Sequence, residues 1–282
     1  MRAQRLDGDH GTAGTVTVLG QDSPLGAEVC RVLTAGGYLP GSAESRVSAL
    51  IIASELAVPG GPLISRHRRR RGARQCRQFA AAARLARGRG ASRLVGLSSA
   101  FIFGRHDHLG SDRSWLCGAP PETAQALAAE AAAETFAEFG GTSVVLRLGW
   151  TYGRADRLTR QILQAGARGW QLLDGPPGAY VPMVEISDAA AAAVAALSAP
   201  PGLYYVTDGH ARNQRELAQI VQEGLGRELH TLADGRWGRG RLFGSSRLVD
   251  GSPFGAVTGW RPRFPDAAEQ LGHLCRTFGD QP

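Results

Sequence analysis

The segment "PETAQALAAEAAAE", from Pro121 to Glu134, contains residue types that could transfer protons from a helix. Its alanines favour a helix, and its ionisable side chains are all carboxylates, with no tyrosine and no lysine. A carboxyl group surrounded by alanine methyl groups has a raised pKa, which suits a general acid or base. Glu122 and Glu130 are therefore candidate catalytic residues. The sequence also allows plainer roles, with Glu122 stabilising the first helical turn and Glu130 on a solvated face.

The loop before this helix, "GRHDHLGSDRSWLCG", contains further groups that suit acid/base chemistry. His106 is the candidate catalytic residue in it, with Asp107, His108 and Asp112 as ionisable neighbours. Two histidines that flank an aspartate in a polar loop are also typical of an exposed surface. Both interpretations stay open.

Four apolar runs alternate with helical segments and must form the framework that positions these groups. They span residues 15–20, 48–57, 93–104 and 142–153. The runs are nearly continuous, which is typical of parallel strands covered by helices on both faces. The sequence therefore predicts an α/β fold: a Rossmann-like doubly wound parallel sheet with a smaller C-terminal substrate lobe.

This pattern divides the chain into three regions. Residues 1–14 are polar and are expected to be a disordered tail, and residues 15–153 form the Rossmann-like domain, shortened after its first helix. Residues 154–282 supply the remaining sheet elements and the C-terminal lobe. Ligands are expected beyond the carboxyl ends of the strands, because open α/β sheets bind them there.

The turn "GQDSPLG", between the first strand and the first helix, has the composition of a dinucleotide-binding loop. Gly20 allows a tight turn, and Gly26 lets the helix pack closely on the strand. Ser23 stands where a third glycine is expected, and its hydroxyl could bond a phosphate or its Cβ could crowd it. NAD(P), if it binds, is expected to contact these three residues at the helix N-terminus.

The acidic residue that binds the cofactor ribose in such sheets has no clear counterpart. It is expected about 20 residues further on, at the end of a second strand. Between the first helix and the next apolar run there is room only for a stub, in which Glu44 and Arg46 are the charged candidates. Glu44 suits a ribose hydroxyl and Arg46 a 2′-phosphate, but plain loop charges are the favoured interpretation.

Six segments occur in an order and spacing that are specific together: "VTVLGQDSPLG", "LVGLSSAFIFG", "VVLRLGWTYG", "VPMVEISDAA", "GLYYVTDG" and "GWRPRFP". With them the chain resembles, from Thr15 to Phe278, the extended short-chain dehydrogenase/reductases. This is the NAD-dependent epimerase/dehydratase family, which includes sugar-nucleotide epimerases, dehydratases and reductases. The resemblance implies a Rossmann domain with a substrate lobe, NAD(P) as cofactor, and a catalytic serine or threonine that matches Ser99.

The catalytic base of that family is the tyrosine of a Tyr-x-x-x-Lys pair on the next helix. The lysine lowers the pKa of the tyrosine and binds the nicotinamide ribose, and the tyrosine moves a proton as hydride is transferred. One alignment places Ala126 and Glu130 at the two positions, and the other places Glu122 and Ala126 there. All 32 Lys and Arg residues are arginines, so no alignment restores the lysine.

Four further residues are candidates for binding a substrate. The guanidinium of Arg147, near the carboxyl edge of the sheet, suits a phosphate or carboxylate, or equally a buried structural pair. Asp188 is expected either to contact the substrate or to cap the alanine-rich helix. Arg247 resembles an arginine that meets a nucleotide phosphate in this family. Tyr152 follows a strand end, so it is expected either at the mouth of a pocket or in ordinary core packing.

Three functions fit these residues. The first, which we predict, is an atypical biosynthetic enzyme that performs dehydration, cyclisation, isomerisation or epimerisation on a small or nucleotide-linked metabolite without the Tyr/Lys pair. The second is a non-catalytic protein that senses a ligand or serves as a scaffold subunit. The third is an NAD(P)-dependent epimerase or reductase with an unusual proton donor, such as Tyr152 or Tyr180.

Composition argues against several other classes of protein. Four scattered cysteines argue against a metal site and a disulfide framework, and favour a reducing cytoplasm. No apolar run is long enough to span a membrane, and the polar N-terminus is not a secretory signal. The basic stretch from Arg66 to Arg77 is expected to be a solvated loop leading into a helix, not a nucleic-acid site. Abundant Ala, Gly and Arg without Lys indicate a GC-rich, actinobacterial genome, and a homodimer is compatible with these features.

Overall fold

The computed structural model describes residues 14–41, 47–54, 62–102, 123–171, 175–231 and 246–279, with the backbone alone for residues 40, 62–73, 231 and 279. The expected N-terminal tail lies outside this part of the chain except for its last residue, Gly14. Glu44 and Arg46, the charged candidates for the cofactor ribose, also lie outside it.

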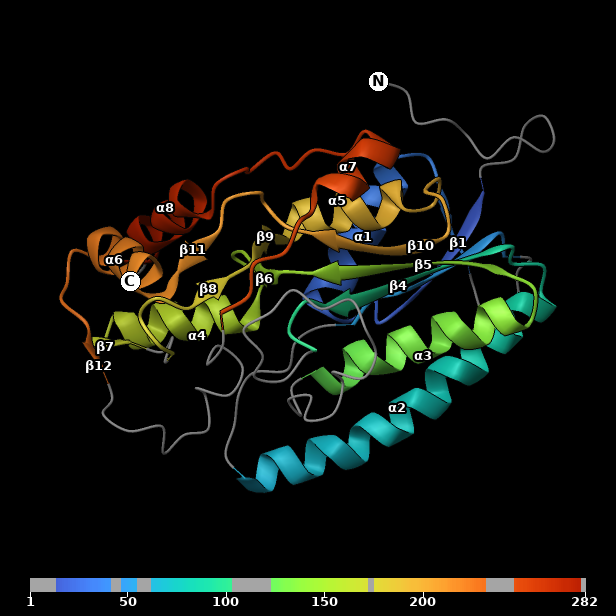
Figure 1. Ribbon diagram of the computed structural model, residues 1–282, viewed down its shortest axis with the longest axis horizontal. Coiled ribbons are helices and arrows are strands. Elements are labelled where there is room, and N and C mark those ends of the chain that lie inside the picture. The colour runs from blue at the N-terminus through green and yellow to red at the C-terminus, as the bar shows by residue number, and fades with distance from the viewer. Residues whose placement is uncertain are drawn as a thin grey trace.

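Six parallel strands form the central sheet, in the order β10-β5-β4-β3-β1-β2 (Figure 1). In chain order these strands are β1 (Thr15–Leu19), β2 (Leu39–Pro40), β3 (Ala49–Ile52), β4 (Arg93–Ser99), β5 (Thr142–Leu148) and β10 (Gly202–Val206). The chain builds outward from β1 on both sides, as in a doubly wound sheet. This confirms the predicted fold class, and it gathers all the carboxyl ends at one edge of the sheet.

Helices from the described part of the chain cover both faces of the sheet (Figure 1). They are α1 (Pro24–Ala35), α5 (Ile186–Ala195) and the short α7 (Ser252–Thr258), then α2 (Pro62–Gly88) and α3 (Ala124–Glu138). The basic stretch from Arg66 to Arg77 lies within α2, so the expected loop is wrong: the backbone there is helical.

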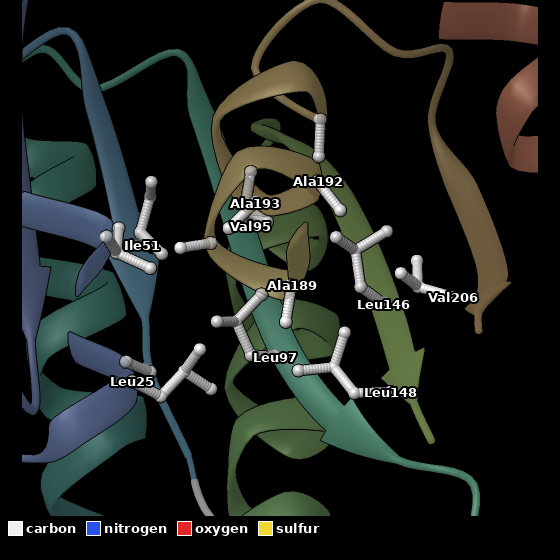
Figure 2. Close-up of a cluster of buried hydrophobic side chains, with 14 of the residues drawn as sticks. Leu25, Ile51, Val95, Leu97, Leu146, Leu148, Ala189, Ala192, Ala193 and Val206 are labelled. Carbon is white, nitrogen blue, oxygen red and sulfur yellow. The ribbon is translucent and has the colours of Figure 1, made fainter. Parts of the chain in front are cut away.

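Alternate side chains of the strands point to opposite faces, and both sets are apolar. Ile51, Val95 and Leu146 belong to the cluster packed against α1 and α5 (Figure 2). Leu50 and Leu94 belong to the cluster packed against α2 and α3. Burial on both faces is the physical reason why the strands are continuous apolar runs in the sequence.

The alanines of α3 fill the narrow space between the sheet and α2. Ala129 and Ala133 are buried in the same cluster as Phe136. A Cβ added to Gly96 of β4 would lie 3.1 Å from the carbonyl oxygen of Ala129, so small residues on both sides let the helix lie close to the strand. Close packing therefore explains the alanine-rich composition of this helix.

The single strand expected over residues 142–153 is divided at Gly149. After that residue β6 (Trp150–Tyr152) leaves the main sheet and pairs in parallel with β9 (Met183–Glu185). A Cβ on Gly149 would lie 2.8 Å from the backbone nitrogen of Met183. A side chain at that position would therefore separate the two segments.

The second strand of the fold is present only as a stub. β2 has two residues and pairs with β1 on the side opposite β3. The link from β2 to β3, residues 41–48, is shorter than the dozen or so residues that a helical crossover needs. Within the described residues the sheet therefore ends at β2, where a full dinucleotide-binding sheet continues.

The C-terminal lobe consists of helices around a second apolar core, which includes Leu163, Leu217 and Leu271. Its elements are α4 (Arg157–Gly166), α6 (Gln214–Leu225) and α8 (Ala267–Gly279), with the two-residue strands β7 (Trp170–Gln171), β8 (Tyr180–Val181), β11 (Arg212–Asn213) and β12 (His230–Thr231). Of the described helices, none is both long and apolar enough to cross a bilayer.

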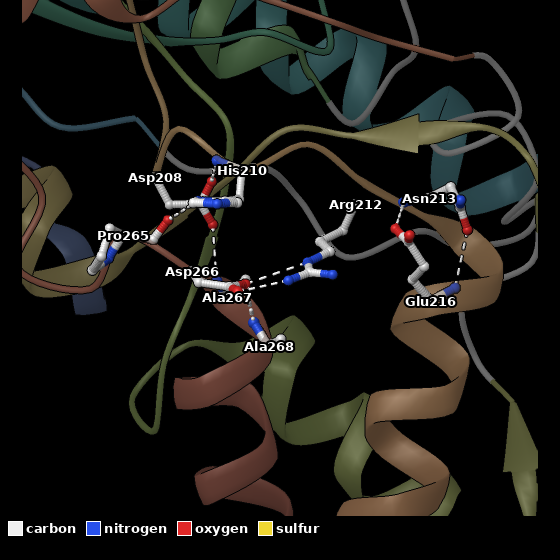
Figure 3. Close-up of polar contacts among 9 residues, drawn as sticks. All are labelled: Asp208, His210, Arg212, Asn213, Glu216, Pro265, Asp266, Ala267 and Ala268. Atoms are coloured by element: carbon white, nitrogen blue, oxygen red, sulfur yellow. Dashed lines mark hydrogen bonds and ion pairs between the residues drawn. The ribbon is translucent and has the colours of Figure 1, made fainter.

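Polar contacts fix the helices of this lobe relative to one another (Figure 3). Arg212, just before α6, forms an ion pair with Asp266, just before α8, at 2.6 Å between Nη2 and Oδ2. Asn213 and Glu216 form a capping box in which each side chain accepts the other residue's backbone N–H. The sequence "NQRE" therefore fixes where α6 begins.

Candidate functional site

The turn after β1 has the geometry of a phosphate-binding loop. Gly20 has a φ of 87°, and a Cβ there would lie 2.5 Å from the carbonyl oxygen of Ala53. A Cβ on Gly26 would lie 1.9 Å from the carbonyl oxygen of Gly20. Both positions therefore require glycine, because the strand, the turn and α1 approach one another closely.

Ser23 serves this turn as the N-cap of α1. Its Oγ accepts the backbone N–H of Gly26 at 3.0 Å and donates to the carbonyl oxygen of Gly20 at 2.7 Å. Pro24, the first residue of the helix, has no N–H to donate. The N-terminus of α1 therefore has fewer free donors for a phosphate than a loop with a third glycine would have.

Ser99 lies at the carboxyl end of β4, where the strand ends earlier than the sequence run 93–104 suggested. It is 4% exposed, and its Oγ accepts the backbone N–H of Phe101 at 3.1 Å. Ser98 is bonded elsewhere: its Oγ donates to Oε1 of Glu130 on α3, at 2.6 Å. The two adjacent serines therefore have different neighbours and different possible roles.

Glu130 and Arg147 form a bidentate ion pair between α3 and β5. Arg147 Nε lies 2.9 Å from Glu130 Oε1, and Nη2 lies 3.0 Å from Oε2. Burial opposes the charge on Arg147, but Glu130 more than offsets it, and the pKa of the guanidinium is raised. Arg147 thus belongs to a buried structural ion pair, which is one of the two roles that the sequence allowed for it. The solvated face expected for Glu130 is wrong, since its side chain is only 12% exposed.

Arg247 lies next to the loop that follows Ser99. Its Cζ is 4.9 Å from the centroid of the Phe101 ring, and its backbone N–H donates to the carbonyl oxygen of Tyr180 at 2.9 Å. Burial lowers the pKa of Arg247 to about 10, so the guanidinium remains cationic at neutral pH. Phe101 contacts both Ser99 and Arg247, and it therefore links two residues that are far apart in the sequence.

Tyr152 and Asp188 are both engaged in packing. Tyr152 is fully buried beside Trp150, and burial raises the pKa of its phenol, which has no hydrogen-bond partner among the described residues. The prediction that Tyr152 lies at the mouth of a pocket is therefore wrong, and its role is core packing. Asp188 Oδ2 accepts the backbone N–H of Phe264 at 2.9 Å, whereas the N-cap of α5 is Glu185, so the cap expected from Asp188 is also wrong.

Several predicted residues lie outside the described part of the chain. They are His106, Glu122, Asp107, His108 and Asp112, all within residues 103–122. Ala126, which occupies the family's tyrosine or lysine position depending on the alignment, is described and buried. In the described residues no group of three or more His, Cys, Asp or Glu side chains is placed to hold a metal ion.

The sequence analysis missed Asp208, a buried carboxylate just after β10. It accepts the backbone N–H groups of His210 and Ala267, each at 3.1 Å (Figure 3). Burial raises its pKa to about 7, although these two hydrogen bonds oppose the shift. An aspartate directly after an apolar strand, as in "GLYYVTD", was the available signal, since strand ends carry functional groups in such sheets.

A parallel sheet with a glycine turn after β1 and a C-terminal helical lobe defines a Rossmann-type fold. Solved structures that share this fold include a UDP-glucose 4-epimerase and a dTDP-glucose 4,6-dehydratase. No protein-family model matches the sequence, and no curated protein is similar to it in sequence.

Three solved structures illustrate the similarity. UDP-glucose 4-epimerase from Thermotoga maritima, solved with UDP-glucose, has a TM-score of 0.74 at 15% identity, covering 94% of this chain and 97% of that one. DesIV, a dTDP-glucose 4,6-dehydratase from Streptomyces venezuelae solved with NAD, has 0.73 at 17%, covering 95% and 97%. RMD from Pseudomonas aeruginosa, solved with NADPH, has 0.71 at 17%, covering 95% and 98%. At these identities the similarity is one of fold.

Proposed function

We propose that this protein is an atypical enzyme of the extended short-chain dehydrogenase/reductase kind that performs acid/base chemistry on a small or nucleotide-linked metabolite. The reaction class is dehydration, cyclisation, isomerisation or epimerisation. The observation that carries the proposal is the position of Arg247 over the ring of Phe101, whose backbone N–H donates to Ser99 Oγ. The Ser99 hydroxyl and the Arg247 guanidinium therefore both contact Phe101, the first through its backbone N–H and the second through its ring.

Ser99 is the catalytic residue of this proposal. Its oxygen already accepts the Phe101 N–H, and its own proton has no acceptor among the described residues. The hydroxyl can therefore donate a hydrogen bond to a substrate oxygen, which polarises a carbonyl group or stabilises a developing negative charge.

Arg247 supports a phosphate-bearing substrate. A buried, charged guanidinium offers a planar set of donors that matches phosphate oxygens, and burial strengthens that interaction. Two neighbours of similar fold are structures with UDP-glucose bound, one of them with NAD as well. A nucleoside diphosphate linked to the reacting group is accordingly the substrate class that we propose.

NAD(P) binding is supported by the two obligatory glycines of the first turn. Gly20 and Gly26 let the strand, the turn and α1 lie close together at the helix N-terminus where a pyrophosphate would bind, and Ser23 closes the turn. A bound nicotinamide supplies hydride chemistry, but a standard relay also needs a phenol and an ammonium beside it. Ala126 cannot supply either group, so we propose that any bound dinucleotide works without that pair.

The remaining proton carriers in the proposal are His106 and Glu122. Glu130 is a weaker candidate, because both of its carboxylate oxygens are bonded to Arg147. Using it as a base would require the ion pair to open in a buried setting, which is costly. Tyr152 is excluded as an alternative donor by its packing, and the half-buried Tyr180 is left for that role.

A non-catalytic ligand-binding protein is the second candidate function. It is favoured by the roles of Ala126 and Glu130, which one alignment places at the family's two catalytic positions: Ala126 is packed in the core, and Glu130 forms a structural ion pair. The enzyme and the non-catalytic protein share a fold and a ligand site, and they differ only in turnover.

The test combines binding and turnover on the full chain. UDP, UDP-glucose and dTDP-glucose are titrated by calorimetry, with and without NAD or NADP, and products are analysed by mass spectrometry. Arg247→Lys should weaken UDP binding by about tenfold or more, because the charge stays but the planar fork is lost. The control Arg215→Lys, at an exposed position on α6, should bind as the wild type does.

The outcomes separate the candidates. Conversion of a nucleotide sugar that is lost in Ser99→Ala supports the enzyme. Binding without conversion of any compound supports the non-catalytic protein. Absence of UDP binding, or equal binding by the wild type and Arg247→Lys, contradicts the substrate class.

A further inference from the structure

A cavity lies in the C-terminal lobe, away from the residues assigned above. It has a volume of about 380 Å³ and is formed between α4 and α8, both visible in Figure 1. Its lining residues are Gly153, Arg154, Arg160, Leu163, Gln164, Leu274, Thr277 and Phe278. Neither Ser99 nor Arg247 is among them, and its size falls within the range of small-molecule sites.

The cavity combines an apolar floor with a cationic rim. Leu163 and Leu274 are buried, and Phe278 is half-buried beside them. Arg154 and Arg160 are exposed, and neither guanidinium has a hydrogen-bond or ion-pair partner among the residues that the structure describes. An apolar surface next to two unpaired cations suits a ligand with an anionic group on an apolar body.

The turn that carries Arg154 is fixed by its own hydrogen bonds. The Gly153 N–H donates to Thr159 Oγ1 at 3.3 Å, and the Asp156 N–H donates to the Gly153 carbonyl at 3.1 Å. Asp156 Oδ2 accepts the N–H and the hydroxyl of Thr159, at 2.6 and 2.8 Å. The backbone of Arg154 is therefore held in place before a ligand arrives, which lowers the entropic cost of binding.

Gly153 adds backbone surface to the cavity wall. Its φ is 153°, and a Cβ there would lie 2.8 Å from Ile186 Cγ2 and 3.0 Å from Glu185 Oε1. Only glycine fits this position, and the turn from β6 into α4 depends on it. The backbone of the turn that carries Arg154 is therefore held in place relative to α4, which carries Arg160.

The geometry points to a second ligand site in this cavity, which binds a small organic anion: a phosphate or carboxylate held by Arg154 and Arg160, with an aromatic or aliphatic body against Leu163, Leu274 and Phe278. It is independent of the function proposed for the Ser99 region, and it stands whether or not the protein is an enzyme.

The test uses phenyl phosphate as the probe, titrated into the full chain by calorimetry. Saturable binding, tighter than that of inorganic phosphate and of phenol, is expected, because both halves of the cavity are needed. The double variant Arg154→Gln/Arg160→Gln should bind about tenfold more weakly or worse. The matched control Arg157→Gln/Arg168→Gln removes two exposed arginines of the same segment outside the cavity, and it should bind as the wild type does.

A second variant keeps the proposal testable if the double variant does not fold. Gln164→Trp places a large side chain from an exposed lining position into the cavity and should abolish phenyl phosphate binding. Ser99→Ala should leave phenyl phosphate binding unchanged. The proposal is overturned by a lack of saturable binding in the wild type, or by full binding in the double variant or in Gln164→Trp.

Discussion

Glu130 and Arg147 face each other across the interface between α3 and the sheet, joined by two hydrogen bonds of 2.9 and 3.0 Å. Ser98 adds a third bond to the same carboxylate, and Tyr205 accepts one from Arg147 at 3.4 Å. In one alignment with the family that the sequence resembles, Glu130 takes the position of the catalytic lysine. The side chain at that position is here an anion that Arg147 neutralises.

Removal of Glu130 should destabilise the fold strongly. In Glu130→Ala the buried guanidinium of Arg147 loses its partner, and the free energy of unfolding should fall by about 3–5 kcal/mol. Chemical denaturation measures the loss. Glu138→Ala, at an exposed position on the same helix, is the control and should change stability by less than about 0.5 kcal/mol.

The double variant Glu130→Leu/Arg147→Met sharpens this prediction. It replaces both charges by apolar groups and should recover most of the lost stability, because no unpaired charge remains buried. A double variant as unstable as Glu130→Ala would contradict the account of the pair as a structural contact.

Substitutions of Ser98 and Ser99 should have different effects, one on stability and the other on turnover. Ser99→Ala removes the free hydroxyl proton and should lower the turnover rate by about 10²–10⁴-fold with little change in the denaturation midpoint. Ser98→Ala loses a bond to Glu130 and should cost about 1 kcal/mol of stability while turnover continues. The rate of nucleotide-sugar conversion and the midpoint are measured on both variants. Loss of turnover in Ser98→Ala but not in Ser99→Ala would contradict the catalytic role of Ser99.

Because of Asp208, the free energy of unfolding should fall as the pH rises towards and through 7. Its folded-state pKa, raised by burial to about 7, lies above the unfolded value near 3.8. The folded state therefore holds a proton that the unfolded state releases between these values, and stability decreases by roughly 1 kcal/mol per pH unit in this window. His210 and the nearby Asp266 are the charged neighbours.

Asp208→Asn provides the comparison for this pH dependence. The amide has no proton to exchange, so its unfolding free energy should vary less between pH 5 and pH 8 than that of the wild type. Denaturation curves at each pH measure the difference. Parallel profiles for the two proteins would show that Asp208 titrates at an ordinary pKa.

Gly26→Ala should disrupt the first turn. The added Cβ would lie 1.9 Å from the carbonyl oxygen of Gly20, so the turn and α1 must separate. We expect a loss of stability of about 2 kcal/mol or more, together with loss of any thermal shift caused by NAD or NADP. Gly88→Ala is the control, since a Cβ there meets no atom within 4 Å. Unchanged stability in Gly26→Ala would contradict the close approach of the first turn and the helix.

The fold could be predicted because its signals are local. Continuous apolar runs such as 15–20 and the glycine turn that follows specify a buried parallel strand and a tight entry into a helix. The break at Gly149 could not be predicted, since it depends on the approach of β9, whose residues lie more than 30 positions further along the chain. The burial of Tyr152 follows from the same pairing.

The sequence by itself determined the doubly wound α/β fold and the absence of any lysine for a proton relay, because apolar periodicity and the absence of a residue type do not depend on contacts. Only the tertiary structure decided that Glu130 neutralises Arg147 and that Arg247 lies beside Phe101, two residues past Ser99. These partners come from separate elements, and packing of helices and lobe against the sheet is what brings their side chains together.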